Sequence, residues 1–116
     1  MKDARSLLEE ALRRSQKNNE KHAEGMSWIL LGRILGKTGP LEINKAEECI
    51  LKGIEICNEL RIKAHYSVGY LFLGELYRYA GQKENALENL KKAEGMFHEM
   101  GMDYWLSRSR ESIAAF

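Results

Sequence analysis

The chain of 116 residues has little proline, little cysteine and no long apolar run. Its one proline, Pro40, leaves room for long uninterrupted helices before and after it. The two cysteines, Cys49 and Cys57, would lie about 12 Å apart in one helix, too far for a disulfide. We therefore predict two small, buried, reduced thiols and a cytoplasmic location.

An excess of charge of either sign is also missing. The 18 Lys and Arg residues are nearly balanced by 17 Asp and Glu residues, and the two kinds are interspersed. No basic block points to nucleic acid, so we predict no nucleic-acid partner. No segment approaches the roughly 20 apolar residues that span a bilayer, and the charged N-terminal sequence lacks the apolar centre of a signal peptide. We predict no membrane association and a single folded domain over residues 1–116, since 44% of the residues are hydrophobic.

The sequence contains no recognisable catalytic or metal-binding set. His22, His65 and His98 fall in or beside different predicted helices, and none belongs to an HExxH motif. Neither cysteine has a CxxC partner or a nearby histidine that would activate a thiol. No glycine-rich segment ends in the Gly-Lys-Ser/Thr of a phosphate loop. We predict that the chain is not an enzyme and binds no metal and no cofactor.

What the sequence does contain is a repeat. Two segments share a pattern of large residue, Leu-Gly and large residue: Trp28-x-x-Leu31-Gly32-x-x-Leu35 and Tyr70-x-x-Leu73-Gly74-x-x-Tyr77. Each is followed by a small-large-small triad, and a third triad precedes them; the triads are Ala4/Leu8/Ala11, Ala46/Ile50/Gly53 and Ala86/Leu90/Ala93. The spacing from Ala11 to Gly32 equals that from Gly53 to Gly74, so the register holds along most of the chain.

This pattern resembles the tetratricopeptide repeat, in a long form with a period of about 40–42 residues rather than the usual 34 or so. The long form is similar to arrays in kinesin light chains, bacterial signal-transduction ATPases and class III adenylate cyclases, and the tail over residues 99–116 is especially similar to the last two. The resemblance implies an all-α fold, a tetratricopeptide-like superhelix of about six antiparallel helices. We expect helices near residues 2–18, 22–37, 44–60, 63–80, 83–99 and 103–115.

Within that domain, we interpret residues 22–60 and 63–99 as two complete repeats. The helix at 103–115 would be a C-terminal cap. The helix at 2–18 is either an N-terminal cap or an unpaired second helix, as in a chain cut from a longer array or one whose end docks onto another molecule.

Local signals place the ends of these helices. Gly81 and Gly101 are expected to end helices in the left-handed conformation, and Asn19 tolerates it at the equivalent position. Arg61 does not favour that conformation, so we expect a different turn there. Side-chain caps are expected from Asn44 paired with Glu47 and from Asp103.

The repeat also predicts which residues form the core between stacked hairpins. The predicted core consists of large apolar residues, namely Leu7, Leu8, Leu12, Leu30, Leu31, Ile34, Ile50, Ile54, Leu73, Leu76, Leu90 and Phe97.

In the resembling family the first helix of each hairpin lines a concave groove that holds a peptide. Carried onto this chain, the candidate groove residues are Met26, Ile29, Arg33, Lys37, Val68, Leu71, Glu75, Arg78, Arg108 and Glu111. The alternative is that they are ordinary surface residues, with Ile29 and Leu71 partly buried. Repeats that grip a C-terminal carboxylate with Lys and Asn are disfavoured, because Glu75 would repel a carboxylate; a mixed apolar and charged segment, or a helix, fits better.

Two functions follow from these observations. The first is a non-enzymatic module that binds a peptide or helix of a partner protein in the groove. The second is a regulatory or assembly segment at the C-terminal end of a larger signalling protein of adenylate cyclase or ATPase type, with self-association through exposed helix ends.

Overall fold

The computed structural model describes residues 3–116, which fold into six α-helices and one 3₁₀ turn without any β-strand. The helices are α1 (Ala4–Lys17), α2 (Lys21–Thr38), α3 (Ile43–Glu59), α4 (Lys63–Tyr79), α5 (Lys83–Met100) and α6 (Asp103–Ala114), and the turn η1 (Pro40–Glu42) joins α2 to α3. The predicted all-α class and helix bounds are confirmed to within two residues, except that residue 2 lies outside the described part. None of the helices in residues 3–116 is both long and apolar enough to cross a membrane.

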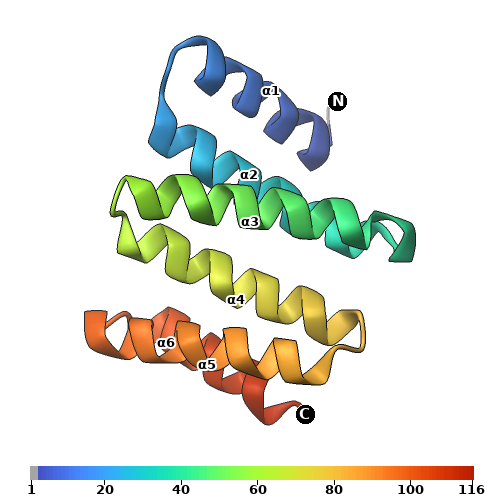
Figure 1. Ribbon diagram of the computed structural model, residues 1–116, viewed down its shortest axis with the longest axis vertical. Coiled ribbons are helices and arrows are strands. Elements are labelled where there is room, and N and C mark those ends of the chain that lie inside the picture. The colour runs from blue at the N-terminus through green and yellow to red at the C-terminus, as the bar shows by residue number, and fades with distance from the viewer. Residues whose placement is uncertain (1–2) are drawn as a thin grey trace.

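The helices α1 to α5 follow one another along the longest dimension of the molecule, which measures 39 × 32 × 24 Å, and α6 overlaps α5 in this view (Figure 1). Consecutive helices pack against each other, and α4 also contacts both α2 and α6. No contacts join α1, α3 and α5 to one another within the described chain. The helices α2, α4 and α6 therefore form a continuous layer, and α1, α3 and α5 pack on it separately.

Glycines allow α2 and α3 to approach closely. A Cβ on Gly32 would stand 2.5 Å from Cγ1 of Ile50 and 2.7 Å from the carbonyl oxygen of Ala46. A Cβ on Gly53 would stand 2.5 Å from Cγ1 of Ile29 and 2.6 Å from the carbonyl oxygen of Gly25. Because real Cβ atoms do not make such contacts, the repeat's small residues mark the places where two helix backbones meet.

The turns that end α1, α3, α4 and α5 share one geometry. Each places a left-handed residue after the helix: Asn19 (φ 58°), Arg61 (φ 60°), Gly81 (φ 82°) and Gly101 (φ 67°). The next residue's N–H donates to a carbonyl five positions back, for example from Ile62 to Cys57 at 2.9 Å. This bond is typical of a Schellman stop. The predictions for Gly81, Gly101 and Asn19 are confirmed. The prediction of a different turn at Arg61 is wrong, because the packing of the helices on both sides of Arg61 imposes the same stop.

The two predicted side-chain caps are also wrong. Asn44 lies inside α3, which begins at Ile43 directly after η1, and Asp103 is itself the first residue of α6. Neither helix has a side-chain cap hydrogen bond at its start. The cap that the structure does contain is Asp3, whose Oδ1 accepts from the Ser6 backbone N–H at 2.8 Å.

The core lies between the two layers and contains most of the predicted residues. Eight of the twelve are buried: Leu12, Leu31, Ile50, Ile54, Leu73, Leu76, Leu90 and Phe97. Leu8, Leu30 and Ile34 are partly buried. Leu7 was predicted wrongly, because it is 53% exposed on the side of α1 that no other described helix covers.

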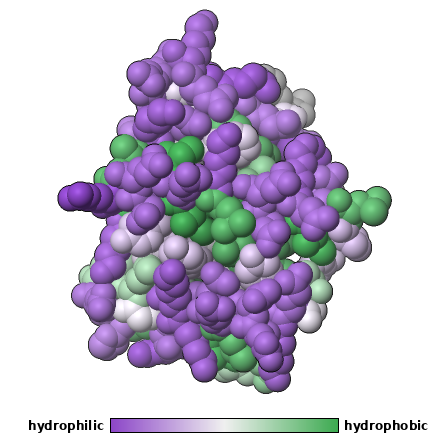
Figure 2. All heavy atoms as spheres, in the orientation of Figure 1, coloured by the Kyte–Doolittle hydropathy of each residue, from purple (hydrophilic) through white to green (hydrophobic). Residues whose placement is uncertain are grey.

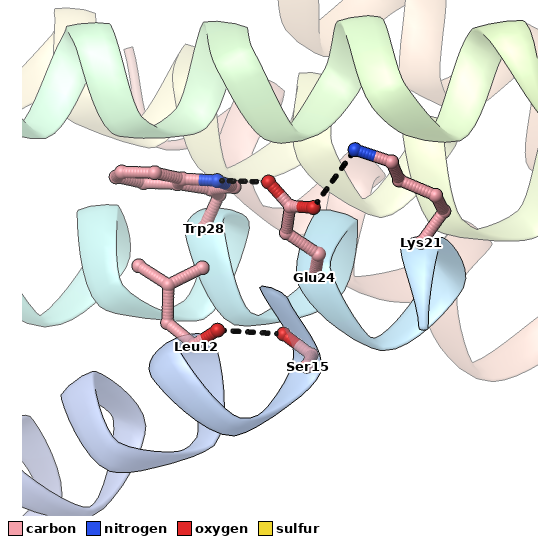
Figure 3. Close-up of polar contacts among 5 residues, drawn as sticks. All are labelled: Leu12, Ser15, Lys21, Glu24 and Trp28. Carbon is pink, nitrogen blue, oxygen red and sulfur yellow. Dashed lines mark hydrogen bonds and ion pairs between the residues drawn. The ribbon is translucent and has the colours of Figure 1, made fainter. Parts of the chain in front are cut away.

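A buried carboxylate stands near the junction of α1 and α2 (Figure 3). Glu24 is 6% exposed, and its Oε2 accepts from Nε1 of Trp28 while its Oε1 pairs with Nζ of Lys21, both at 3.3 Å. Burial alone would raise the pKa of Glu24, but these hydrogen bonds outweigh it and hold the pKa below its usual range. Nearby in α1, the buried Ser15 hydroxyl donates to the Leu12 carbonyl oxygen at 2.8 Å.

Candidate functional site: a pocket between α2 and α4

A pocket of about 130 Å³ opens between α2 and α4, in the continuous layer of the fold. We call it the α2–α4 pocket; it is lined by Gly32, Arg33, Gly36, Lys37, Ile50, Phe72, Glu75, Leu76 and Tyr79. Its lining combines apolar groups from three helices with two cations from α2 and a carboxylate from α4. This combination suits a ligand that is partly apolar and partly charged.

The side chain of Arg33 reaches from α2 to α4. Its guanidinium carbon lies 4.3 Å from the centre of the Phe72 ring, within the range of a cation–π contact. The Nε atom of Arg33 is buried and has no hydrogen-bond acceptor. Lys37 follows one turn later on α2 and is exposed. Within residues 3–116 neither cation forms an ion pair.

Glu75 faces the pocket from α4 but is already engaged by α6. Its Oε1 lies 3.2 Å from Nη2 of Arg108 and accepts a longer hydrogen bond from the Ser112 hydroxyl at 3.5 Å. Both charged side chains of the pair are about three-quarters buried, which limits screening by solvent. The expected repulsion of a carboxylate by Glu75 is therefore offset by Arg108.

Three predicted groove residues do not line any groove. Ile29 and Leu71 are fully buried, and Val68 is 6% exposed. Ile29 fills the space left by two glycines, Gly53 of α3 and Gly69 of α4. The first helix of a hairpin here packs against both its own partner and the next hairpin, so its apolar positions belong to the core. The alternative weighed from sequence expected Ile29 and Leu71 to be partly buried, whereas both are 0% exposed.

The structure brings three predicted residues together in the pocket: Arg33, Lys37 and Glu75. Arg108 belongs to the same site through its pair with Glu75. Met26 is partly buried and Glu111 is exposed, and neither lines the pocket.

Arg78 lies elsewhere than predicted. It is exposed and its guanidinium carbon stands 5.7 Å from the centre of the Phe116 ring, so it contacts the C-terminal end rather than the pocket.

Sequence reasoning missed the aromatic part of the site. Phe72 and Tyr79 lie on α4, three residues before and four residues after Glu75, and therefore share its helix face. Extending the face of Glu75 by one helical turn would have identified Tyr79, just as Lys37 follows Arg33 by one turn. Phe72 was harder to find, because its ring is buried beneath Arg33.

The opposite face, which carries α3 and α5, has a different character. Hydrophilic side chains cover most of it, around a hydrophobic patch over the middle of α3 (Figure 2). Leu51 of α3 is 45% exposed. A second, more open pocket of about 260 Å³ lies at the start of α5 and is lined by the polar side chains of Gln82, Lys83, Glu84 and Asn85.

The thiols and histidines offer little chemistry. Cys49 and Cys57 are free and buried, and burial raises the pKa of both thiols, which lowers their thiolate content. Burial, with the neighbouring His22 adding to it, lowers the pKa of His65, whose Nδ1 has no partner. Among residues 3–116, no group of three or more His, Cys, Asp or Glu side chains is arranged to hold a metal ion.

Comparison with known proteins returned no match to a family model, to a curated protein or to a solved structure.

Proposed function

We propose that this chain is a non-enzymatic protein-binding module of tetratricopeptide type, which holds a peptide or helix of a partner protein at the α2–α4 pocket. The observation that carries the proposal is the pocket itself, in which unpaired Arg33 and Lys37 border an apolar floor. A concave, mostly apolar pocket with a few polar groups at its edge is the usual form of a ligand-binding site. The in-register repeats, with glycines at the helix contacts, support the tetratricopeptide assignment.

Selection from a display library of random peptides tests this function. Peptides enriched on the wild-type chain should lose at least ten-fold in affinity on a K37E/Y79S double variant. Both side chains are exposed and line the pocket, so the far-ultraviolet circular dichroism and the melting temperature should hardly change.

The matched control is K45E/L51S, which makes the same kinds of change at exposed positions of α3. It should leave peptide affinity unchanged. Failure to enrich any sequence, or equal loss in both double variants, would contradict binding at this pocket.

A second function, assembly through α1, has its own observation. Ala46 and Ile50 of α3 are fully buried against α2. At the equivalent positions of the repeat in α1, Ala4 is exposed and Leu8 is only partly buried. We propose that this open face of α1, together with Leu7, packs against a second copy of the chain, in a regulatory or assembly role of the kind found in larger signalling proteins.

Sedimentation equilibrium of the chain over a wide concentration range tests assembly. The average mass should rise with concentration, and L7E should return it to the monomer value near 13.4 kDa. The control L41E alters a leucine that is 98% exposed on η1 and should leave association unchanged. A constant monomer mass in the wild type would rule out this function.

A further inference from the structure

The α2–α4 pocket holds an uncompensated cationic donor. The Nε–H of Arg33 is removed from water and meets no acceptor in the protein, a state that costs more than an exposed donor does. The Phe72 ring lies 4.3 Å from the guanidinium carbon and supplies a contact to its face, but no hydrogen-bond acceptor. A ligand oxygen beside Nε would relieve this cost, and Arg33 is partly exposed and lines the pocket.

The charges around the pocket favour an anion. Lys37 lies one turn from Arg33 and is unpaired, whereas the carboxylate of Glu75 is held by Arg108 at 3.2 Å. The pocket therefore presents two unpaired cations and one compensated acid. Among anions, a carboxylate is matched by the adjacent Nε and Nη donors of a guanidinium, which form two parallel hydrogen bonds with it.

The floor of the pocket favours an aliphatic group next to that carboxylate. Ile50 and Leu76 provide the apolar side chains of the floor, and they fill the space beside Gly32 and Gly36, where an added Cβ would stand 2.5 Å from Ile50 and 2.7 Å from Leu76. Its volume of about 130 Å³ is close to that of a cavity that holds one benzene-sized group, so it takes one side chain and not a folded segment.

We infer that the α2–α4 pocket is an anchor site for an acidic peptide segment, binding one branched aliphatic side chain on its floor and an adjoining side-chain carboxylate at Arg33 and Lys37. This inference rests on the proposed function and names the chemistry of its ligand. It accounts for both the unpaired donor and the apolar floor with one occupant.

The smallest probe of this chemistry is 4-methylpentanoate, which joins a branched aliphatic group to a carboxylate. Titration into the ¹⁵N-labelled chain should shift the backbone resonances of residues 32–37 and 72–79. The neutral isostere 4-methylpentanamide should bind roughly ten-fold more weakly or worse, because it lacks the charge. Raising the salt concentration should lower the affinity for the carboxylate probe but not for the amide, since the carboxylate's partners are partly exposed cations.

Two variants locate the effect. R33M keeps an unbranched side chain over Phe72 but removes the guanidinium, and it should abolish the preference for carboxylate over amide without lowering the melting temperature. K37Q should reduce the preference in part, and K45Q, an exposed lysine of α3, should leave it intact.

Equal binding of the two probes, or a preference that survives R33M, would overturn the anchor assignment. Neither result would affect the peptide selection described above, whose readout is loss of selected peptides on K37E/Y79S. If selected peptides bind but lack an acidic residue beside an aliphatic one, the anchor chemistry is wrong while the binding function stands.

Discussion

Single residues in this chain adopt conformations that their own preferences oppose. Arg61 has a positive φ of 60°, which costs a residue with a Cβ roughly 1–2 kcal/mol, yet it forms the same stop as Gly81 and Gly101. Its N–H donates to the Asn58 carbonyl oxygen at 3.0 Å, and the next N–H reaches Cys57. The turn is thus specified by the packing of α3 against α4 and not by the residue within it.

Replacing Arg61 with glycine should therefore stabilise the fold. We expect R61G to raise the free energy of unfolding by about 0.5–1 kcal/mol, because relief of strain exceeds the added flexibility of the unfolded chain. Urea denaturation followed by circular dichroism measures the change.

The reverse change provides the control. G81R, at the equivalent turn after α4 where a Cβ would meet no neighbour, should destabilise by a similar amount. A neutral or destabilising R61G would show that Arg61 contributes a compensating interaction.

A second residue-scale feature is the hydrogen bond from the Tyr77 hydroxyl to Oε2 of Glu47, which joins α4 to α3 at 2.6 Å. Burial, followed by this bond to a carboxylate, raises the pKa of Tyr77 to about 12. Because the pKa is higher in the folded state than the unfolded value of about 10, the stabilisation is complete below pH 10 and is lost as pH rises toward 12.

Tyrosine substitutions should reveal this dependence. Y77F is expected to flatten the fall in unfolding free energy between pH 10 and 12, as measured by urea denaturation at each pH. Y104F, at a side chain that is 67% exposed, should leave the fall as in the wild type. An unchanged pH profile in Y77F would assign the alkaline loss to other groups.

At the scale of helices, the close approach of α2 and α3 depends on glycines that helix propensity would not select. The same glycine-to-alanine substitution at two helical positions distinguishes the effect of packing from that of helix propensity. G32A places a Cβ against the Ala46 carbonyl oxygen and the Ile50 side chain, so we expect a loss of roughly 1–3 kcal/mol in unfolding free energy. G95A meets no atom within 4 Å inside α5 and should gain about 0.5–1 kcal/mol.

Thermal and urea unfolding of the two variants measure this contrast. Equal effects of the same sign would show that the α2–α3 contact relaxes without cost, contrary to the tight geometry around Gly32.

The helices were predictable from the sequence because the repeat fixes both their number and their phase. The small residues Gly32 and Gly74 lie where two helices come into close contact, as predicted. The predicted left-handed helix ends occur at glycine and asparagine residues. The caps at Asn44 and Asp103 failed, because the 3₁₀ turn at Pro40 shifts the start of α3 and because α6 begins directly at Asp103. Helix ends are defined only to within one or two residues, so a cap predicted from sequence is easily displaced by one position.

The site was only partly predictable for a similar reason. Arg33 and Lys37, one turn apart, were named because they occupy first-helix positions that line the groove in the resembling family. Ile29 and Leu71 were misplaced, because the sequence does not reveal that α2 and α4 pack against each other as well as against their hairpin partners. The pair of Glu75 with Arg108 spans two helices and has no local signal.

At the scale of the whole molecule, stability should vary along the stack. The first helix, α1, contacts α2 alone, whereas α2, α3 and α4 are each covered from at least two sides. Because a helix covered on one side opens more easily than one covered on two, amide hydrogen exchange should be fastest in α1 and slowest in α2 to α4. Exchange followed by NMR under native conditions measures the gradient, and uniform protection across all helices would indicate one cooperative unit.

The unequal contacts of the two layers have a mechanical consequence. In the described part of the chain α4 contacts both α2 and α6, while α1, α3 and α5 do not contact one another, so we expect bending of the stack to separate the second set of helices more readily than the first. The α2–α4 pocket lies between two of these contacting helices, so a change in the angle between α2 and α4 would change the width of the pocket. If the proposed ligand binds there, its affinity would depend on that angle, and an occupied pocket would hold the angle fixed.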